Sequence, residues 1–332
     1  MYVLYGEKKE KGNRMYRVGI DLGGTNIKVG IVDEKQNLIR QSFAPTEAKR
    51  PAEEVIKDMA DQVKKVLAEE KLSLIDIEGI GIGCAGTIDA KHGTVPYSNN
   101  LAWENVPLAD LMKKYLDADC TIRVSNDANC AALGEAKAGA ARGIDNVVLL
   151  TLGTGVGGGV IIDGKIFEGA HAGGAELGHT SLILGGRQCT CGRRGCVECY
   201  VSANGLIRSA QEAAKKNPQS LLNRMCGDDL EKMNGKIPFD AMQQQDEAAI
   251  AVVQQYIAYL TESIANFVNL FRPDMVLLSG GICNQGENLT DPINENLAKL
   301  CFAGEKAFVP QVQCASLGNL AGIIGAANLL DM

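Results

Sequence analysis

Residues 16–32 read Tyr-Arg-Val-Gly-Ile-Asp-Leu-Gly-Gly-Thr-Asn-Ile-Lys-Val-Gly-Ile-Val, two apolar runs on either side of a glycine turn. This pattern predicts a strand over 16–21, a turn over 22–26 and a second strand over 27–32. A third strand is expected over 38–43. The succession returns later in the chain, with strands over 146–152 and 160–163, a glycine turn over 153–159 between them and a short strand over 165–167. A strand, glycine turn, strand, strand unit is therefore expected twice.

The rest of the chain mixes helical and strand patterns. Apolar residues at helical spacing predict a helix over 53–70, and the strand expected over 77–83 carries glycines on one face. Further helices are expected over 108–115, 128–141, 204–216, 246–271 and 317–330, and further strands over 121–125, 275–278 and 312–315.

Composition limits the classes of protein that fit. A chain of 332 residues exceeds the usual size of one hydrophobic core, so two lobes are expected. The net charge of -7 disfavours a general nucleic-acid or anionic-membrane surface. No apolar run approaches the ~18 residues of a membrane span. Residues 1–15 form a charged leader without periodicity, which we expect to be disordered.

The glycine turns favour phosphate binding over dinucleotide binding. Gly153, Gly155 and Gly158 match G-x-G-x-x-G, but that fingerprint requires a helix to follow, whereas residues 160–167 predict a β-hairpin. The sequence also lacks G-x-x-x-x-G-K-[ST]. Two glycine turns in matching positions can each present backbone N–H groups to an anion. We therefore expect a phosphate site shared between the lobes.

A cysteine-rich segment indicates a structural zinc site. Residues 179–198 read His-Thr-Ser-Leu-Ile-Leu-Gly-Gly-Arg-Gln-Cys-Thr-Cys-Gly-Arg-Arg-Gly-Cys-Val-Glu. Zinc takes four nitrogen or sulfur ligands, and the glycines allow tight turns. Cys189, Cys191 and Cys196 are three ligands, and either His179 or Cys199 is the fourth. The odd count of 11 cysteines and the lack of a secretory signal fit a reducing compartment, so a cytoplasmic location is expected.

These segments together resemble the ROK family of sugar kinases and repressors. Asp21-Leu-Gly-Gly-Thr-Asn-Ile-Lys28 resembles the first phosphate motif of the family, and Leu152-Gly-Thr-Gly-Val-Gly-Gly-Gly159 its second. Glu176-Leu-Gly-His179 and the cysteine segment are similar to its two signatures, and Ser279-Gly-Gly281 is similar to its adenosine motif. The resemblance runs from about residue 16 to the end of the chain.

The resemblance implies a two-lobed actin/hexokinase fold, which is an α/β fold of the ribonuclease H-like type, with a structural zinc loop. The small lobe would comprise residues 16–134 with 316–332, and the large lobe residues 135–315. The closing helix would pack on the first lobe. The implied zinc ligands are His179, Cys189, Cys191 and Cys196, which leaves Cys199 as a buried spectator.

The implied activity is ATP-dependent phosphorylation of a hexose 6-hydroxyl, glucose being the first expectation. The family's general base falls on Asp127, although an Asp that follows a strand and opens a helix is most simply an N-cap. The implied sugar-binding residues are Asn100, Asn126, Asp127, Glu176, His179 and Glu198. The implied residues for ATP and its transient Mg²⁺ are Asp21, Gly23, Gly24, Thr25, Lys28, Gly153, Thr154, Gly155, Gly280 and Gly281. Lys28 has a simpler alternative as a solvated strand residue.

Other functional classes remain open. A kinase for N-acetylglucosamine, N-acetylmannosamine or fructose would share these motifs, as would a sugar-sensing protein without catalysis. Repressors of the family carry a helix-turn-helix domain before the first phosphate motif, and the short leader disfavours one here. The resemblance also implies a homodimer, with sugar and ATP as the small-molecule partners and no nucleic acid or membrane.

Overall fold

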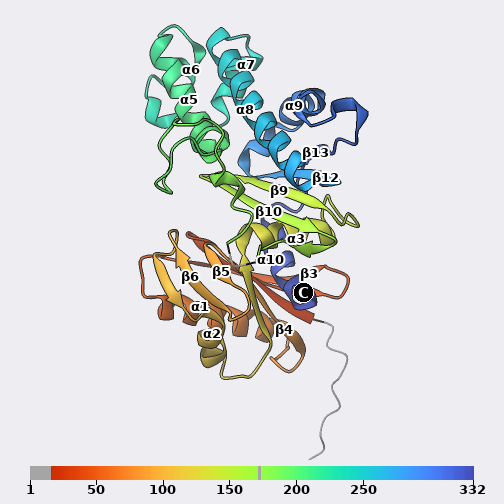
Figure 1. Ribbon diagram of the computed structural model, residues 1–332. Helices are drawn as coiled ribbons and strands as arrows, with labels where there is room; N and C mark the ends of the chain where they lie inside the picture. Colours follow the sequence, from red (N-terminus) through yellow and green to blue (C-terminus); the bar gives the residue numbers. More distant parts are fainter. Residues whose placement is uncertain (1–15, 171–172) are drawn as a thin grey trace, which may run out of the picture. The chain divides into compact units, whose positions relative to one another are not determined.

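The computed structural model describes residues 16–170 and 173–332, so the leader expected over residues 1–15 lies outside the described part. The chain divides into two compact units. The first unit comprises the residues up to Cys130 together with Gly322–Met332. The second unit comprises Ala131–Ala321. Each unit is built around a mixed five-stranded sheet (Figure 1).

The first unit contains the predicted antiparallel hairpin and its third strand. Its sheet has the order β3-β2-β1-β4-β8. β1 pairs antiparallel with β2 and parallel with β4, which pairs parallel with β8. The strands are β1 (Tyr16–Leu22), β2 (Asn26–Asp33), β3 (Leu38–Pro45), β4 (Ile77–Cys84) and β8 (Ile122–Asn126). The helices α1 (Ala52–Glu69) and α2 (Leu108–Leu116) bury their apolar faces in the same core as the sheet.

Glycines on one face of this sheet admit the closing helix, α10 (Ala321–Asn328). A Cβ at Gly19 would lie 1.9 Å from the carbonyl oxygen of Ile323, and one at Gly81 would lie 1.7 Å from that of Ala326. Only glycine lets a helix backbone approach a sheet so closely. The expected packing of the closing helix on the first unit is therefore confirmed.

We expect Gly81→Ala to lower the free energy of unfolding by about 3 kcal/mol, because the new methyl group must displace helix backbone rather than a flexible side chain. Gly23→Ala is the matched control, since a Cβ there would meet only the Asn26 carbonyl oxygen at 3.6 Å. Urea unfolding of both variants measures the difference. Equal stability of the two variants would contradict the packing described here.

The second unit repeats the strand arrangement of the first. Its sheet has the order β11-β10-β9-β12-β13, again with an antiparallel hairpin and then parallel strands. The strands are β9 (Val147–Leu152), β10 (Val156–Ile162), β11 (Lys165–Ile166), β12 (Met275–Ser279) and β13 (Gln311–Cys314). The predicted repeat of strand, glycine turn, strand, strand is thus confirmed.

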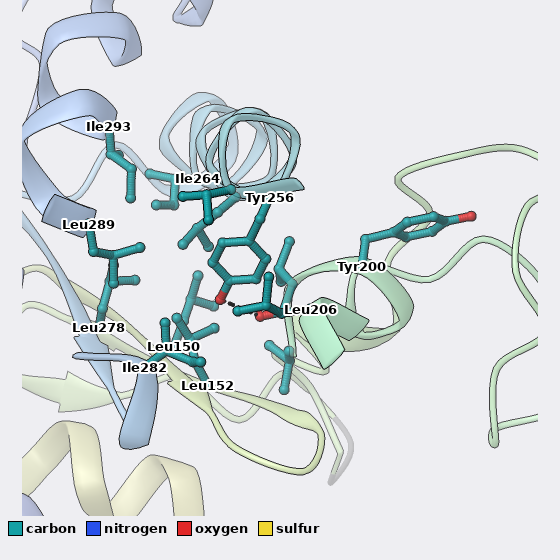
Figure 2. Close-up of a cluster of buried hydrophobic side chains, with 14 of the residues drawn as sticks. Leu150, Leu152, Tyr200, Leu206, Tyr256, Ile264, Leu278, Ile282, Leu289 and Ile293 are labelled. Carbon is teal, nitrogen blue, oxygen red and sulfur yellow. Dashed lines mark hydrogen bonds between the residues drawn. The ribbon is translucent and has the colours of Figure 1, made fainter. Parts of the chain in front are cut away.

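Helices surround the second core. They are α4 (Glu198–Val201), α5 (Ala203–Lys216), α6 (Leu221–Met225), α7 (Ile237–Gln243), α8 (Glu247–Phe271) and α9 (Glu287–Leu300), and α3 (Asp127–Ala138) leads in from the first unit. Figure 2 shows Tyr256 of α8 inside this core, among Leu150, Leu278 and Ile264. Its hydroxyl donates to the carbonyl oxygen of Val201 at 2.9 Å, which satisfies the buried polar group.

The predictions of local structure need correction at several points, and the helices α6, α7 and α9 were not predicted. β10 begins at Val156, so three of the glycines expected in the turn lie within a strand. The closing α-helix spans only Ala321–Asn328, with a 3₁₀ turn on each side. A small sheet, β5 (Thr87–Asp89), β6 (Thr94–Ser98) and β7 (Trp103–Val106), was not predicted. Within the described residues, no helix has the length and apolar character to cross a membrane.

Candidate active site

In the first unit, three parallel strands end at one edge of the sheet and bring polar groups there. Leu22 of β1 lies opposite Cys84 of β4, which lies opposite Asn126 of β8. Asp21 and Asp127 flank these positions. Burial raises the pKa of the Cys84 thiol well above its usual range, and the carboxylates of Asp127 and Asp21 act in the same direction. Open α/β sheets bind ligands at the carboxyl ends of their strands, so this edge is a candidate site.

The first glycine turn lies beside this edge and is held in place. The Gly23 carbonyl oxygen accepts a hydrogen bond from the Thr46 hydroxyl at 2.7 Å. A Cβ at Gly24 would lie 3.3 Å from the carbonyl oxygen of Asn100, so the turn and the loop that carries Asn100 are neighbours. The structure therefore brings two of the predicted sugar and phosphate segments together.

Lys28 is not simply a solvated strand residue. It lies opposite Asp21 in the β1–β2 pair, and its ammonium group contacts the Asp21 carboxylate at 2.8 Å. The two side chains are 22% and 17% exposed. A cation and a carboxylate therefore stand together beside the glycine turn.

The capping contacts at the start of α3 come mainly from Asn126 rather than from Asp127. The Asn126 Oδ1 atom accepts from the N–H groups of Ala128 and Asn129, at 2.9 and 3.4 Å. Its Nδ2 donates to the Gly86 carbonyl oxygen at 3.1 Å. Asp127 is the first helical residue, and its Oδ1 accepts from the Ala128 N–H at 2.9 Å. The positive end of the helix favours a charged carboxylate at this position.

In the second unit, Glu198 connects the second glycine turn with the cysteine segment. Its Oε2 atom accepts from the Val156 N–H at 3.0 Å. Its Oε1 atom lies 3.7 Å from the Cys189 Sγ and 3.4 Å from the Thr190 hydroxyl. A Cβ at Gly155 would lie 2.3 Å from Oε2. Glycine at 155 therefore leaves the space that the Glu198 carboxylate fills.

Gly280 follows β12 and approaches the neighbouring strand β9. A Cβ at Gly280 would lie 2.3 Å from the Leu152 carbonyl oxygen, and its φ of 107° suits glycine. A Cβ at Gly281 would meet no atom within 4 Å. The predicted adenosine motif thus has one glycine fixed by packing and one with open space beside it.

Four predicted ligands form a group able to hold a metal ion. One ligand atom from each of His179, Cys189, Cys191 and Cys196 lies within 4.8 Å of all the others. The Cys189 Sγ lies 3.7 Å from the His179 Nδ1, and the sulfurs of Cys191 and Cys196 are 3.7 Å apart. Cys199 is not in the group, and its thiol donates to the Gln188 carbonyl oxygen at 3.5 Å. It is partly exposed, so the expectation that it is buried was wrong.

Glu176 lies close to the same group. It immediately precedes the 3₁₀ turn Leu177–His179. Burial raises the pKa of its carboxyl group; His179 opposes this shift and the Glu198 carboxylate adds to it. Glu176, His179 and Glu198 are therefore within electrostatic reach of one another.

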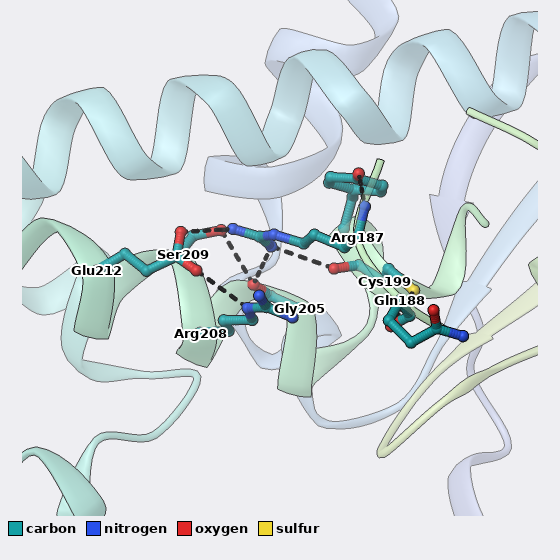
Figure 3. Close-up of polar contacts among 8 residues, drawn as sticks. Arg187, Gln188, Cys199, Gly205, Arg208, Ser209 and Glu212 are labelled. Atoms are coloured by element: carbon teal, nitrogen blue, oxygen red, sulfur yellow. Dashed lines mark hydrogen bonds and ion pairs between the residues drawn. The ribbon is translucent and has the colours of Figure 1, made fainter. Parts of the chain in front are cut away.

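Arg187 anchors the cysteine segment and was missed from the sequence. Figure 3 shows its guanidinium group among the carbonyl oxygens of Cys199 and Gly205, the Ser209 hydroxyl and the Glu212 carboxylate, at 2.9 to 3.3 Å. The guanidinium also lies over the Tyr200 ring, 5.1 Å from its centroid. No sequence signal distinguishes it from the other arginines of the segment.

Comparison with known proteins identifies the family of this chain. The family model described as "ROK family" matches residues 17–332. The chain belongs to the ROK family. The resemblance noted in the motifs is thus confirmed over nearly the whole chain.

Several ROK proteins are similar to this chain along its length. A protein of Thermotoga maritima named glucokinase is 36% identical over 316 residues, which cover 94% of this chain and 96% of the relative. A ROK family glucokinase from Streptomyces griseus, solved with glucose and AMPPNP, is 33% identical with a TM-score of 0.79. The match covers 95% of this chain and 98% of that chain. A ROK hexokinase from Thermus thermophilus is 30% identical with a TM-score of 0.77, covering 95% and 97%.

Proposed function

We propose that this ROK protein is an ATP-dependent glucokinase that transfers the γ-phosphoryl group of ATP to the 6-hydroxyl of glucose. The observation that carries the proposal is the similarity to glucokinases over more than nine-tenths of both chains, one of them solved with glucose and an ATP analogue. The placement of Asp127 supports it, because a carboxylate at a strand end and a helix start suits proton abstraction.

Asp127 is proposed as the general base. Phosphoryl transfer to an alcohol requires a group that accepts the hydroxyl proton as the new O–P bond forms. Asp127 lies in the first turn of α3, where the helix dipole favours the negative charge of a carboxylate. Asn126 holds this helix start through its three hydrogen bonds.

The remaining roles follow the ROK resemblance. In addition to Asp127, the proposed sugar ligands are Asn100, Asn126, Glu176, His179 and Glu198. Phosphate contacts would come from Gly23, Gly24, Thr25 and Lys28 and from Gly153, Thr154 and Gly155, with Gly280 and Gly281 toward the adenosine. Asp21 would hold Mg²⁺ directly or through water, since Mg²⁺ prefers few carboxylates together with phosphate oxygens. Lys28 forms an ion pair with that carboxylate, and its ammonium group is proposed to bind phosphate as well. We also propose that the small lobe comprises residues 16–134 with 316–332 and that the large lobe comprises residues 135–315.

The metal of the cysteine group is proposed to be zinc. Two thiolates bound tetrahedrally at 2.3 Å lie about 3.8 Å apart. The 3.7 Å separation of the Cys191 and Cys196 sulfurs agrees with this distance between two thiolate ligands. The His179 Nδ1 faces the Cys189 thiol, which would leave Nε2 of the same ring for a sugar hydroxyl. Such a zinc ion would orient a substrate ligand as well as stabilise the loop.

A coupled ADP-release assay with MgATP and a panel of sugars tests the proposed function. The panel comprises glucose, mannose, fructose, N-acetylglucosamine, N-acetylmannosamine and allose. We expect kcat/KM to be highest for glucose, because hydroxyl-binding sites strongly reject analogues that leave polar groups unpaired. A clear preference for another sugar would overturn glucose as the substrate, and no turnover with any sugar would favour a sensor.

Gly155→Ala tests the position of Glu198. The new Cβ would displace the end of a flexible carboxylate rather than backbone, so stability should change little. Displacement of Glu198 should raise KM for glucose by about tenfold, the effect of losing one hydrogen bond to a charged group. Steady-state kinetics and a melting curve measure the two effects. If the KM of Gly155→Ala for glucose equals that of the wild type, Glu198 does not bind the sugar.

A further inference from the structure

Two cysteines lie at the same end of neighbouring strands in the second unit. β12 and β13 run parallel, with Leu278 opposite Cys314. Beyond Ser279 the chain turns at Gly280 into a 3₁₀ helix, Gly281–Gln285, which carries Cys283. The Cys283 N–H donates to the Gly280 carbonyl oxygen at 3.0 Å, and this hydrogen bond closes the turn that follows β12.

The Cys314 thiol contacts Cys283. Its Sγ lies 3.7 Å from the Cys283 carbonyl oxygen, and the thiol of each residue shifts the pKa of the other. Both residues are partly exposed, whereas Cys84, Cys130, Cys226 and Cys301 are buried. The Cys283 thiol lowers the pKa of Cys314 to about 7, against the effect of burial. This shift favours the thiolate of Cys314, the form that reacts with oxidants.

We propose that Cys283 and Cys314 form a reversible disulfide in response to hydrogen peroxide and that this disulfide weakens nucleotide binding. The Cys314 thiolate attacks one peroxide oxygen, the O–O bond breaks, and a sulfenic acid and hydroxide result. The Cys283 sulfur then attacks the Cys314 sulfur, the S–O bond breaks, and water leaves with the Cys283 proton. Overall, two thiols and one peroxide give one disulfide and two waters.

The effect on nucleotide binding rests on the proposed role of Gly280 and Gly281 in the adenosine site. A disulfide needs an S–S distance of about 2.05 Å, well below the separation of two thiols in a hydrogen bond. Contraction would pull the 3₁₀ helix toward β13. Gly280 packs closely against the backbone of Leu152, because a Cβ added at Gly280 would lie 2.3 Å from the Leu152 carbonyl oxygen. Gly280 therefore has little room to move. The displacement therefore falls on Gly281, the next residue.

Peptide mapping tests the bond without any assay of activity. Trypsin is expected to give fragments 237–299 and 307–332, each with one cysteine, because the Arg272–Pro273 bond resists cleavage. After treatment with hydrogen peroxide, the two fragments should appear linked, and dithiothreitol should separate them. Absence of this linked pair, or linkage of either cysteine to a different one, would overturn the proposal.

Calorimetry with AMPPNP and the KM for MgATP test the consequence. We expect peroxide to weaken nucleotide affinity by about tenfold in the wild type, with KM for glucose unchanged and full recovery in dithiothreitol. Cys283→Ser and Cys314→Ser should each resist, and Cys120→Ser, a partly exposed cysteine of the first unit, should respond as the wild type does. Metal content is followed in parallel, because Cys191 is exposed.

Equal loss of affinity in Cys314→Ser and wild type would overturn the proposed effect. The linked fragments and the AMPPNP measurement do not require sugar turnover. Failure of the protein to phosphorylate glucose is therefore distinguishable from failure of the disulfide proposal.

Discussion

Asp127→Asn should lower kcat with glucose by about 10²–10⁴ while leaving glucose binding close to that of the wild type. Asparagine keeps the shape of the side chain and its contact with the Ala128 N–H but cannot accept the hydroxyl proton. The cap of α3 belongs to Asn126, so the helix start should survive the change. ADP release measures kcat, and glucose calorimetry measures binding.

Asp110→Asn is the matched control for that experiment. Asp110 is an exposed carboxylate in the first turn of α2, so it shares the residue type and a place in a first helical turn without a proposed role. Its kcat should equal that of the wild type. Turnover by Asp127→Asn within about tenfold of the wild type would eliminate Asp127 as the base.

Cys191→Ser should cost the protein its metal and much of the order of the cysteine segment. Wild-type protein should contain one zinc ion per chain, and the variant should lose it, because a hydroxyl is a poor substitute for thiolate. Metal binding contributes to folding free energy, so the melting temperature should fall by several degrees. KM for glucose should rise as well, since Glu176, His179 and Glu198 lie around the same group. Elemental analysis and melting curves measure the loss.

Cys199→Ser separates the two ligand sets that the sequence left open. Cys199 lies in the same segment but bonds to the Gln188 carbonyl oxygen, outside the four-residue group. This variant should keep its zinc. Loss of zinc from Cys199→Ser would support the alternative set of Cys189, Cys191, Cys196 and Cys199. A wild-type protein without zinc would contradict both ligand sets.

Regular strands and helices were predictable because their side-chain patterns repeat. Runs of Val and Ile interrupted by glycine located β1 and β2, and the continuous apolar run Val147–Leu150 located β9. The helical spacing from Val55 to Leu67 located α1. The small sheet β5–β7 was missed because strands of three to five residues, one reading Thr-Ile-Asp, are too short to show a period. The start of β10 was predicted too late in the sequence. Three consecutive glycines suggested a turn, but in the structure they pair with β9 as part of the strand.

Contacts between distant residues explain most of what the sequence did not reveal about the site. The metal group was predictable because its cysteines are close in sequence. Arg187 binds residues up to 25 positions away, and Cys283 meets Cys314 across 31 positions. Such pairs depend on how strands and helices pack, which no local pattern encodes. The choice of Asn126 as the cap likewise depended on geometry, since Asn126 and Asp127 are equally suitable residue types.

Identification of the phosphorylated product is the sharpest test of the proposed glucokinase activity. Purified protein is incubated with MgATP and glucose, and the sugar product is measured with a reaction specific for glucose 6-phosphate. We expect one glucose 6-phosphate for each ADP released, and formation of both products by Asp127→Asn at far below the wild-type rate. Release of ADP without glucose 6-phosphate, or no reaction with glucose under these conditions, would contradict it.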